Sequence, residues 1–220
     1  MKKLTALLFA IAGVISFMLT GCSNSEEFTE KTYHSADAEI ASIIIQTTDR
    51  ELEIVASEDN QIHIDYFDGK KEYLNIAVSD KNELIVKLEF DKKPSDFFGL
   101  QSSDEYRKIH VRIPNDIISD CSVVTTNEDI RISSVSLTDR MNVNVNGGNI
   151  FIEKVNVGKA IELTAKNGNI TGSVLGGWDD YSMLCNVKKG ECNLPANKEE
   201  GEKSLFANCN NGNIDIEFVK

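Results

Sequence analysis

The sequence lacks an excess of positive charge, and it lacks the apolar spacing of amphipathic helices. Its 220 residues carry 23 Lys and Arg against 35 Asp and Glu, which gives a net charge of −12 at pH 7. This balance excludes a basic surface for nucleic acid and disfavours electrostatic docking on anionic lipid. Beyond the first 21 residues, no stretch repeats apolar residues at the i, i+3, i+4 spacing of a helix. The absence of that spacing predicts an all-β fold.

Familiar catalytic and metal-binding motifs are also missing. The chain has no Gly-x-Ser-x-Gly elbow, no glycine-rich phosphate loop and no His-Glu-x-x-His. Its three histidines are scattered, and its cysteines form no Cys-x-x-Cys pair near a histidine. We therefore expect no catalytic residue, no metal site and no cofactor.

The N-terminus has the organisation of an export signal. Two lysines follow Met1, an almost wholly apolar run extends from Leu4 to Leu19, and Leu19-Thr20-Gly21-Cys22 follows. Charged, apolar and small-residue regions in this order predict a secretory signal peptide over residues 1–21. The last four residues resemble the lipobox of bacterial lipoproteins, which implies a diacylglycerol thioether on Cys22. An uncleaved anchor helix is the alternative.

Either anchor would attach the chain to the lipid bilayer and place its bulk outside the cytoplasm. Residues 22–37 are polar and acidic, so they are expected to form a tether. Residues 38–220 are expected to form one β-strand-repeat domain, with regular repeats from about residue 121. Removal of the signal peptide would lower the net charge to −14.

One short phrase recurs in the last third of the chain. It appears as Asn-Gly-Gly-Asn-Ile and twice as Asn-Gly-Asn-Ile, with two degenerate copies. If the residues ending these phrases are equivalent, they are spaced 20, 20, 22 and 22 apart: Ile130, Ile150, Ile170, Cys192 and Ile214. A near-constant period in this range indicates stacked supersecondary units.

Alternating apolar residues precede each phrase. At nine, seven and five residues before Ile170 stand Ile161, Leu163 and Ala165, and three of the other four phrases match this pattern. The phrase ending in Ile150 fits less fully, because Met141 is taken to be out of phase. A period of two predicts strands with one buried face, and Asn-Gly permits a sharp corner with positive φ.

Two topologies satisfy this pattern. Asn-Gly between alternating runs is also a hairpin signal, which would make consecutive strands antiparallel neighbours. The regular period favours a β-solenoid with repeats of 20–22 residues, in which each strand stacks on its counterpart one repeat away. The Asn and Gly residues are then corner chemistry, and the Asn side chains can form ladders between coils.

The first half of the domain is also predicted to be strands. Turn signals separate runs rich in β-branched and aromatic residues, which are Ala38–Gln46, Glu51–Ala56, Gln61–Phe67, Tyr73–Ser79, Glu83–Phe90 and Arg107–Pro114.

Two insertions interrupt the rhythm and are candidates for contacts with a partner. One holds Phe97 and Phe98 in a polar loop, and the other holds Trp178 and Tyr181 beside two aspartates. Exposed apolar or aromatic loops can grip a protein or stack on a sugar ring. The alternative for each is a loop that packs on its own sheet.

Four cysteines besides Cys22 fall on the inward column of the repeat: Cys121, Cys185, Cys192 and Cys209. No two in adjacent coils share an offset, whereas a disulfide needs Cα atoms about 4.4–6.8 Å apart. We therefore expect free, buried cysteines that fill the core. Cys185 with Cys209 is the nearest candidate pair if the register slips.

The Asn-Gly-Asn-Ile corners and alternating strands behind a signal sequence resemble the bacterial putative-adhesin family of β-strand-repeat envelope proteins, whose function is unknown. The resemblance covers roughly Ala38–Lys220 and is best from Cys121 onward. It implies a solenoid like a right-handed β-helix and no catalytic residue.

Three functions remain open. The first is a membrane-anchored extracytoplasmic lipoprotein with a non-catalytic module for binding or adhesion, whose partner is an envelope protein or a glycan. The second is an envelope-stress or signalling accessory that binds a membrane protein. The third is a polysaccharide-active β-helix enzyme, which would need clustered carboxylates on one face.

Overall fold

The computed structural model describes residues 27–35, 39–91 and 103–220. The predicted signal peptide, Cys22, Phe97 and Phe98 lie outside these described residues. Within them the regular structure is β-strand, apart from the short 3-10 turns η2 (Asp104–Arg107) and η3 (Trp178–Asp180). None of the helices in this part of the chain could cross a bilayer.

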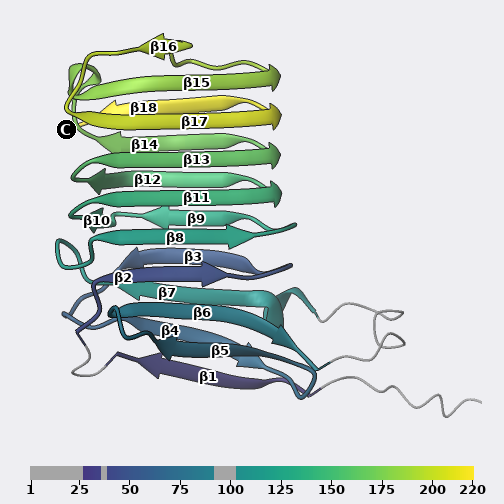
Figure 1. Cartoon of the computed structure of the whole chain (residues 1–220). Coiled ribbons are helices and arrows are strands. Elements are labelled where there is room, and N and C mark those ends of the chain that lie inside the picture. Colours follow the sequence, from purple (N-terminus) through teal and green to yellow (C-terminus); the bar gives the residue numbers. More distant parts are fainter. Residues whose placement is uncertain (1–26, 36–38, 92–102) are drawn as a thin grey trace, which may run out of the picture.

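The strands form two mixed nine-stranded sheets that face each other (Figure 1). Sheet I contains, in spatial order, β1 (Thr29–His34), β4 (His63–Asp68), β7 (Lys108–Ile113), β3 (Glu51–Ala56), β9 (Ile130–Ser133), β12 (Ile150–Val157), β14 (Ile170–Leu175) and β18 (Ile214–Val219), and β10 (Ser136–Leu137) pairs with β12. Sheet II contains β16 (Asn197–Lys198), β15 (Tyr181–Lys189), β17 (Lys203–Asn211), β13 (Ala160–Asn167), β11 (Arg140–Gly147), β8 (Asp120–Thr125), β2 (Ser42–Gln46), β6 (Glu83–Phe90) and β5 (Glu72–Val78).

A corner joins a strand of sheet II to the strand of sheet I that follows it in the chain. We call two strands that follow each other in this way a rung. Rungs β8–β9, β11–β12 and β13–β14 stack in parallel, with Ile130, Ile150 and Ile170 in register. The hairpin alternative is therefore wrong for these repeats. Their anchor isoleucines are fully buried, as the period of two predicted.

Met141 belongs to the inward column, contrary to the sequence interpretation. It pairs with Cys121 on one side and Ile161 on the other, and only 1% of its surface is exposed. Its offset of nine residues before Ile150 is the same as that of Ile161 before Ile170. The unbranched side chain fills the same core position as its branched neighbours.

The last two rungs do not stack in chain order. Strand β17 lies between β13 and β15, and β18 pairs with β14, while Cys192 forms a bridge to Ile214. The five anchor residues are equivalent, as predicted, but their spatial order is Ile130, Ile150, Ile170, Ile214 and Cys192. The final rung of the chain is thus inserted inside the stack.

The opposite end of the stack has the same kind of insertion. Rung β2–β3 lies between β6–β7 and β8–β9, with every contact parallel. Strands β5, β4 and β1 then pair antiparallel at this end. All six strands predicted in the first half of the domain are present, with ends shifted by up to four residues. Strand β1 lies within residues 22–37, so that segment is not a tether throughout.

The corners explain the recurring Asn-Gly phrase. Gly168 has a φ of +149°, and a Cβ there would lie 1.8 Å from the carbonyl oxygen of Gly148 in the neighbouring rung. Only glycine fits such close stacking. The predicted side-chain ladder is present, because Oδ1 of Asn149 accepts the backbone N–H of Asn169, and Oδ1 of Asn169 accepts that of Asn213.

The cysteine prediction was half right. Cys121 and Cys209 are free and buried, and burial chiefly, with Asp120 nearby, raises the pKa of the Cys121 thiol to about 12. Cys185 and Cys192, however, form a disulfide with Cα atoms 7.2 Å apart. The sequence argument compared only adjacent rungs. These two residues face each other across one rung, from opposite sides of its corner.

Candidate functional site: the outer face of sheet II

The outer faces of the two sheets differ in chemistry. On sheet I the charged side chains near the β1 end pair with one another. Their ion pairs are Arg112 with Asp65 (2.9 Å), Lys108 with Glu51 (3.6 Å) and Arg131 with Asp129 (3.0 Å). Arg131 also lies 4.1 Å from the ring centroid of Phe151. The charged side chains in this part of sheet I therefore pair with one another, while Glu153 on β12 and Glu217 on β18 are exposed.

The outer face of sheet II is organised in three rows that run across the strands. The central row contains Ile85, Ile44, Ser122, Asn142, Glu162, Phe206 and Leu184, each in register with the next. The flanking rows contain Glu83, Ser42, Asp120, Arg140, Ala160, Ser204 and Ser182 on one side, and Lys87, Gln46, Val124, Asn144, Thr164, Asn208 and Asn186 on the other. We call these 21 residues the sheet II face.

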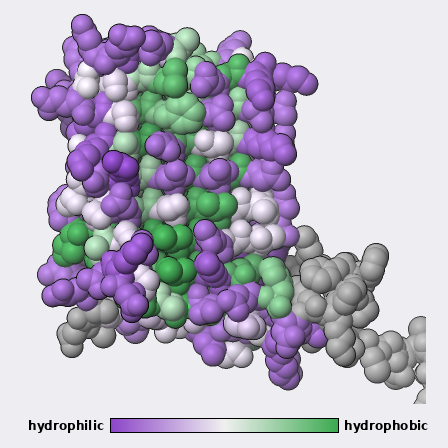
Figure 2. Space-filling model, in the orientation of Figure 1, coloured by the Kyte–Doolittle hydropathy of each residue, from purple (hydrophilic) through white to green (hydrophobic). Residues whose placement is uncertain are grey.

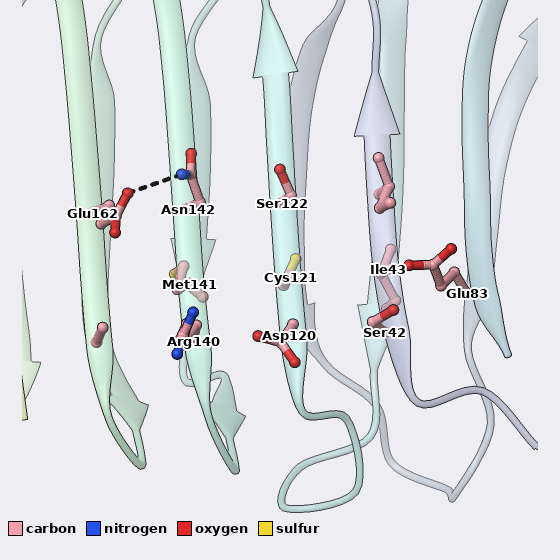
Figure 3. A pocket seen from close by; sticks show the side chains of 12 residues that line it. Ser42, Ile43, Glu83, Asp120, Cys121, Ser122, Arg140, Met141, Asn142 and Glu162 are labelled. Carbon is pink, nitrogen blue, oxygen red and sulfur yellow. Dashed lines mark hydrogen bonds between the residues drawn. The ribbon is translucent and has the colours of Figure 1, made fainter. Parts of the chain in front are cut away.

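A shallow depression of about 360 Å³ crosses the middle of the sheet II face (Figure 3). Its lining includes Ser42, Asp120, Ser122, Arg140 and Asn142. Small side chains on β2 and β8 create the hollow, and the longer Arg140 and Asn142 stand beside it. Hydroxyl, amide, carboxylate and guanidinium groups therefore meet on one open surface, where they can both donate and accept hydrogen bonds.

Few of these polar groups are used within the chain. The Asn142 amide donates to Oε2 of Glu162 at 3.1 Å. Arg140 lies 3.4 Å from Asp139, yet 63% of its side chain remains exposed. Asp120 accepts a hydrogen bond from the Ser119 hydroxyl at 2.6 Å. Most of the face is thus available to a partner.

Apolar side chains border this polar centre at both ends. Ile85 and Ile44 stand toward the β5 end, and Phe206 and Leu184 stand toward the β16 end, where Leu184 is 42% exposed. Figure 2, which views this side of the molecule, shows hydrophobic surface gathered toward both ends with hydrophilic side chains between. Contiguous exposed apolar patches, such as those at the two ends of this face, are typical of interaction surfaces.

Sequence reasoning named part of this face and missed the rest. The alternation in the repeats places Asn142, Asn144, Glu162 and Thr164 on the outward face, but no sequence pattern marks them as a cluster. The apolar ends went unnoticed, although the unbroken runs Ile43-Ile44-Ile45 and Leu84-Ile85-Val86 carry a signal. A strand without alternation has an apolar second face.

The predicted contact residues have different fates. Tyr181 is wrong as a contact, because its side chain is fully buried and its hydroxyl donates to the carbonyl oxygen of Leu175 at 2.8 Å. Burial, with a contribution from Asp180, raises its pKa to about 12. Trp178 is 44% exposed and packs edge-on against Phe218 at 5.4 Å. A role for Trp178, Phe97 or Phe98 in binding stays a prediction.

The structure also brings two histidines together. His34 on β1 and His63 on β4 face each other with their Nδ1 atoms 2.6 Å apart, and Nε2 of His63 lies 2.9 Å from Oδ1 of Asp59. Hydrogen bonds from His63, Gln61 and Ser57 lower the pKa of Asp59 to about 2. His110 lies 3.3 Å from Glu53. These contacts link neighbouring strands. Among the described residues, no cluster of three or more His, Cys, Asp or Glu side chains could hold a metal ion.

Comparison with protein-family models identifies the family of this chain. The family model described as "Toastrack DUF4097" matches residues 40–171, more than half of the chain. The chain belongs to this family. A search of curated proteins found no match.

Two solved structures of bacterial proteins are similar to this chain to different degrees. A putative cell adhesion protein from Clostridium sporogenes ATCC 15579 superposes with a TM-score of 0.68 at 12% identity, covering 88% of this chain and 100% of that one. A putative adhesin from Bacteroides fragilis NCTC 9343 has a TM-score of 0.44 at 15% identity, covering 87% and 97%. At these identities the first likeness establishes the fold alone.

Proposed function

We propose that this protein is an extracytoplasmic lipoprotein, anchored in the bilayer through an acylated Cys22, whose non-catalytic repeat domain binds a partner through the sheet II face. The contrast between the two outer faces carries this proposal. Toward the β1 end, sheet I pairs its charged side chains with one another, whereas sheet II leaves amide, hydroxyl and apolar groups open over seven strands. The adhesin names of the structural neighbours agree with a binding role.

The architecture we propose for this domain is a β-solenoid. The parallel register at 20-residue intervals and the glycine corners support it. Stacking of this kind produces a broad, flat and rigid face, which suits recognition of an extended surface. We propose no hydrolytic role, since the carboxylate of Glu162 is bonded to Asn142 on an open sheet rather than held in a cleft.

The signalling alternative is favoured by the position of β1. Because β1 begins at Thr29, only residues 22–28 separate Cys22 from the sheet. Seven residues span at most about 25 Å. Phe28 is already fixed by stacking on Tyr106, with ring centroids 4.9 Å apart. A domain held this close to the bilayer meets proteins of its own membrane more readily than a distant surface.

Site-specific photocrosslinking in cells tests the proposal. The photoreactive residue p-benzoylphenylalanine replaces Asn144 on sheet II or, as the matched control, Thr171 on the outer face of sheet I. We expect adducts from position 144 only. Equal adducts at both positions, or adducts at 171 alone, would refute the sheet II face as the binding surface.

The anchor is tested separately with Cys22→Ala. We expect the wild-type chain to incorporate labelled palmitate and to sediment with membranes, and the variant to do neither. A membrane-protein adduct at position 144 that disappears in Cys22→Ala would select the signalling accessory. A wall-polymer adduct would select the adhesion-type module.

A further inference from the structure

We propose that the sheet II face binds a second copy of this chain, across a two-fold axis that runs along β11. This inference rests on the proposed function, since it names the partner of the same face. A closed two-fold interface must be self-complementary, because each residue meets the residue that takes its place on the other side of the axis. The sheet II face satisfies this condition row by row.

The central row is chemically symmetric about Asn142. From that residue outward, one side has Ser122, Ile44 and Ile85, and the other has Glu162, Phe206 and Leu184. A two-fold rotation along β11 therefore places each apolar pair on the apolar pair of the second copy. The polar centre meets a polar centre, and the two Asn142 amides can donate to and accept from each other.

The row with Arg140 adds a charge complement. Arg140 lies on β11 and Asp120 on the neighbouring strand β8, in register. Rotation sets Arg140 opposite Arg140 of the second copy on the axis, and it sets Asp120 of the second copy opposite Ala160, beside both guanidinium groups. The guanidinium can then pair with that carboxylate, and the symmetric pair forms on the other side. Arg140 has the free surface for this contact, because 63% of its side chain is exposed beside Asp139.

The third row is matched without any charge conflict. The axis sets Val124 against Thr164 of the second copy and Asn208 against Gln46. Lys87 meets the amide of Asn186 rather than another lysine. Amides can bond with amides across such an interface, and the threonine methyl packs on valine.

The size of the face is at the lower limit for a specific dimer. Seven strands at about 4.8 Å spacing and five residues at about 3.3 Å rise give a patch of roughly 29 by 17 Å on each copy. Two such patches cover about 1,000 Å², the lower bound for a specific interface. Two flat sheets can pack face to face about 10 Å apart with side chains interleaved.

Cysteine crosslinking of the full-length chain in its own membrane tests this geometry. Asn142→Cys lies on the axis, with its Cα about 10 Å from that of its copy, so a short bismaleimide reagent should join the two thiols and give a dimer of twice the chain mass. Thr171→Cys, on the opposite face, is the matched control and should remain monomeric. Ile85→Cys and Leu184→Cys should crosslink to each other when co-expressed on differently tagged chains, but neither should crosslink to itself.

Disruption of the apolar ends gives an independent readout. Phe206→Lys should reduce the Asn142→Cys dimer at least about tenfold, while Asp215→Lys on sheet I should leave it unchanged. Circular dichroism verifies that both variants retain the fold. An unchanged dimer in Phe206→Lys, or equal crosslinking of Thr171→Cys, overturns the two-fold arrangement.

The failure of this inference can be told apart from failure of the proposed function. Photocrosslinks from position 144 to a different protein or a glycan, with no thiol-to-thiol crosslink at position 142, would refute the dimer and leave the binding face intact. Absence of any adduct from sheet II would refute both.

Discussion

At the N-terminal end of the stack, rung β2–β3 lies between β6–β7 and β8–β9, and at the C-terminal end rung β17–β18 lies between β13–β14 and β15. At each end, therefore, a rung from near one end of the domain's sequence lies between two other segments of the stack rather than at its edge. The two ends are locked differently. The N-terminal end has a buried ion pair between Arg50 and Glu72 at 2.6 Å, whereas the C-terminal end has the Cys185–Cys192 disulfide.

At each end, a polar side chain also bonds the backbone of an exposed edge strand, but the residue that does so differs. At the N-terminal end, Oδ1 of Asp68 accepts the backbone N–H of Leu74 on β5 at 2.8 Å. At the C-terminal end, the Asn193 amide bonds both the N–H and the carbonyl oxygen of Ile216 on β18, each at 3.0 Å. A side chain that takes the place of a missing strand satisfies edge groups that would otherwise recruit another chain. The backbone groups of the edge strands are therefore satisfied by local side chains, independently at each end of the stack.

The ion pair should give the largest effect on stability. Glu72→Gln leaves the Arg50 guanidinium, which is 5% exposed, without a carboxylate. Loss of one partner of a buried pair costs about 3–5 kcal/mol, measured by urea unfolding. The double variant Arg50→Met, Glu72→Leu should be less destabilised than Glu72→Gln. An equal loss in both would contradict a role for the unpaired charge.

The disulfide should have the second-largest effect, and at the other end. Cys185→Ala with Cys192→Ala opens a loop with a sequence separation of seven residues. The chain-entropy model gives about 2–3 kcal/mol for a loop of this size. Hydrogen exchange should accelerate in β15 and β16 and stay unchanged in β4 and β5. Faster exchange at both ends would mean that the stack unfolds as one unit.

The edge amide should contribute less. Asn193→Ala removes two hydrogen bonds to Ile216 and should cost about 1–2 kcal/mol. Exchange of the Ile216 amide reports the loss directly. Asp68→Ala is the matched variant at the N-terminal end and should expose the Leu74 amide instead. Each variant should leave the other amide protected.

The smallest effect should come from acid, and only at the N-terminal end. The folded-state pKa of Asp59 is lowered from 3.8 to about 2, chiefly by its hydrogen bond with His63. A lowered pKa stabilises the folded chain above about pH 4, and this contribution disappears as the pH falls from about 4 to about 2. Asp59→Asn should remove this part of the acid dependence in thermal melts between pH 5 and pH 2. An unchanged acid profile would show that Asp59 plays no part.

Much of the fold was predictable because its rules are local. The alternation around Ile170, the Asn-Gly corners and the Asn ladder all follow from backbone and side-chain geometry within one repeat and its neighbour. The order of the last two rungs was not predictable. Ile214 and Cys192 follow similar phrases, and either could stack on Ile170, so the local pattern does not distinguish the two arrangements.

The candidate site was predictable only in fragments. The polar residues Asn142 and Glu162 were visible as outward positions, but their union with Ile44 and Phe206 depends on which rungs are neighbours. Phe206 meets Glu162 only because β17 is inserted beside β13. Tyr181 was misjudged because its polar neighbours in the loop concealed a buried position at the start of β15.

The inserted rung at the C-terminal end has a consequence for synthesis. A chain that has emerged only as far as residue 199 contains β15, yet β15 has no neighbouring strand in its final sheet apart from the two-residue β16. The two sheets can close only when Lys203–Val219 arrives and enters the gap between β13 and β15. Residues Lys203–Val219 therefore hold β15 in its sheet, and a chain truncated before them loses the pairing of β15 as well as rung β17–β18.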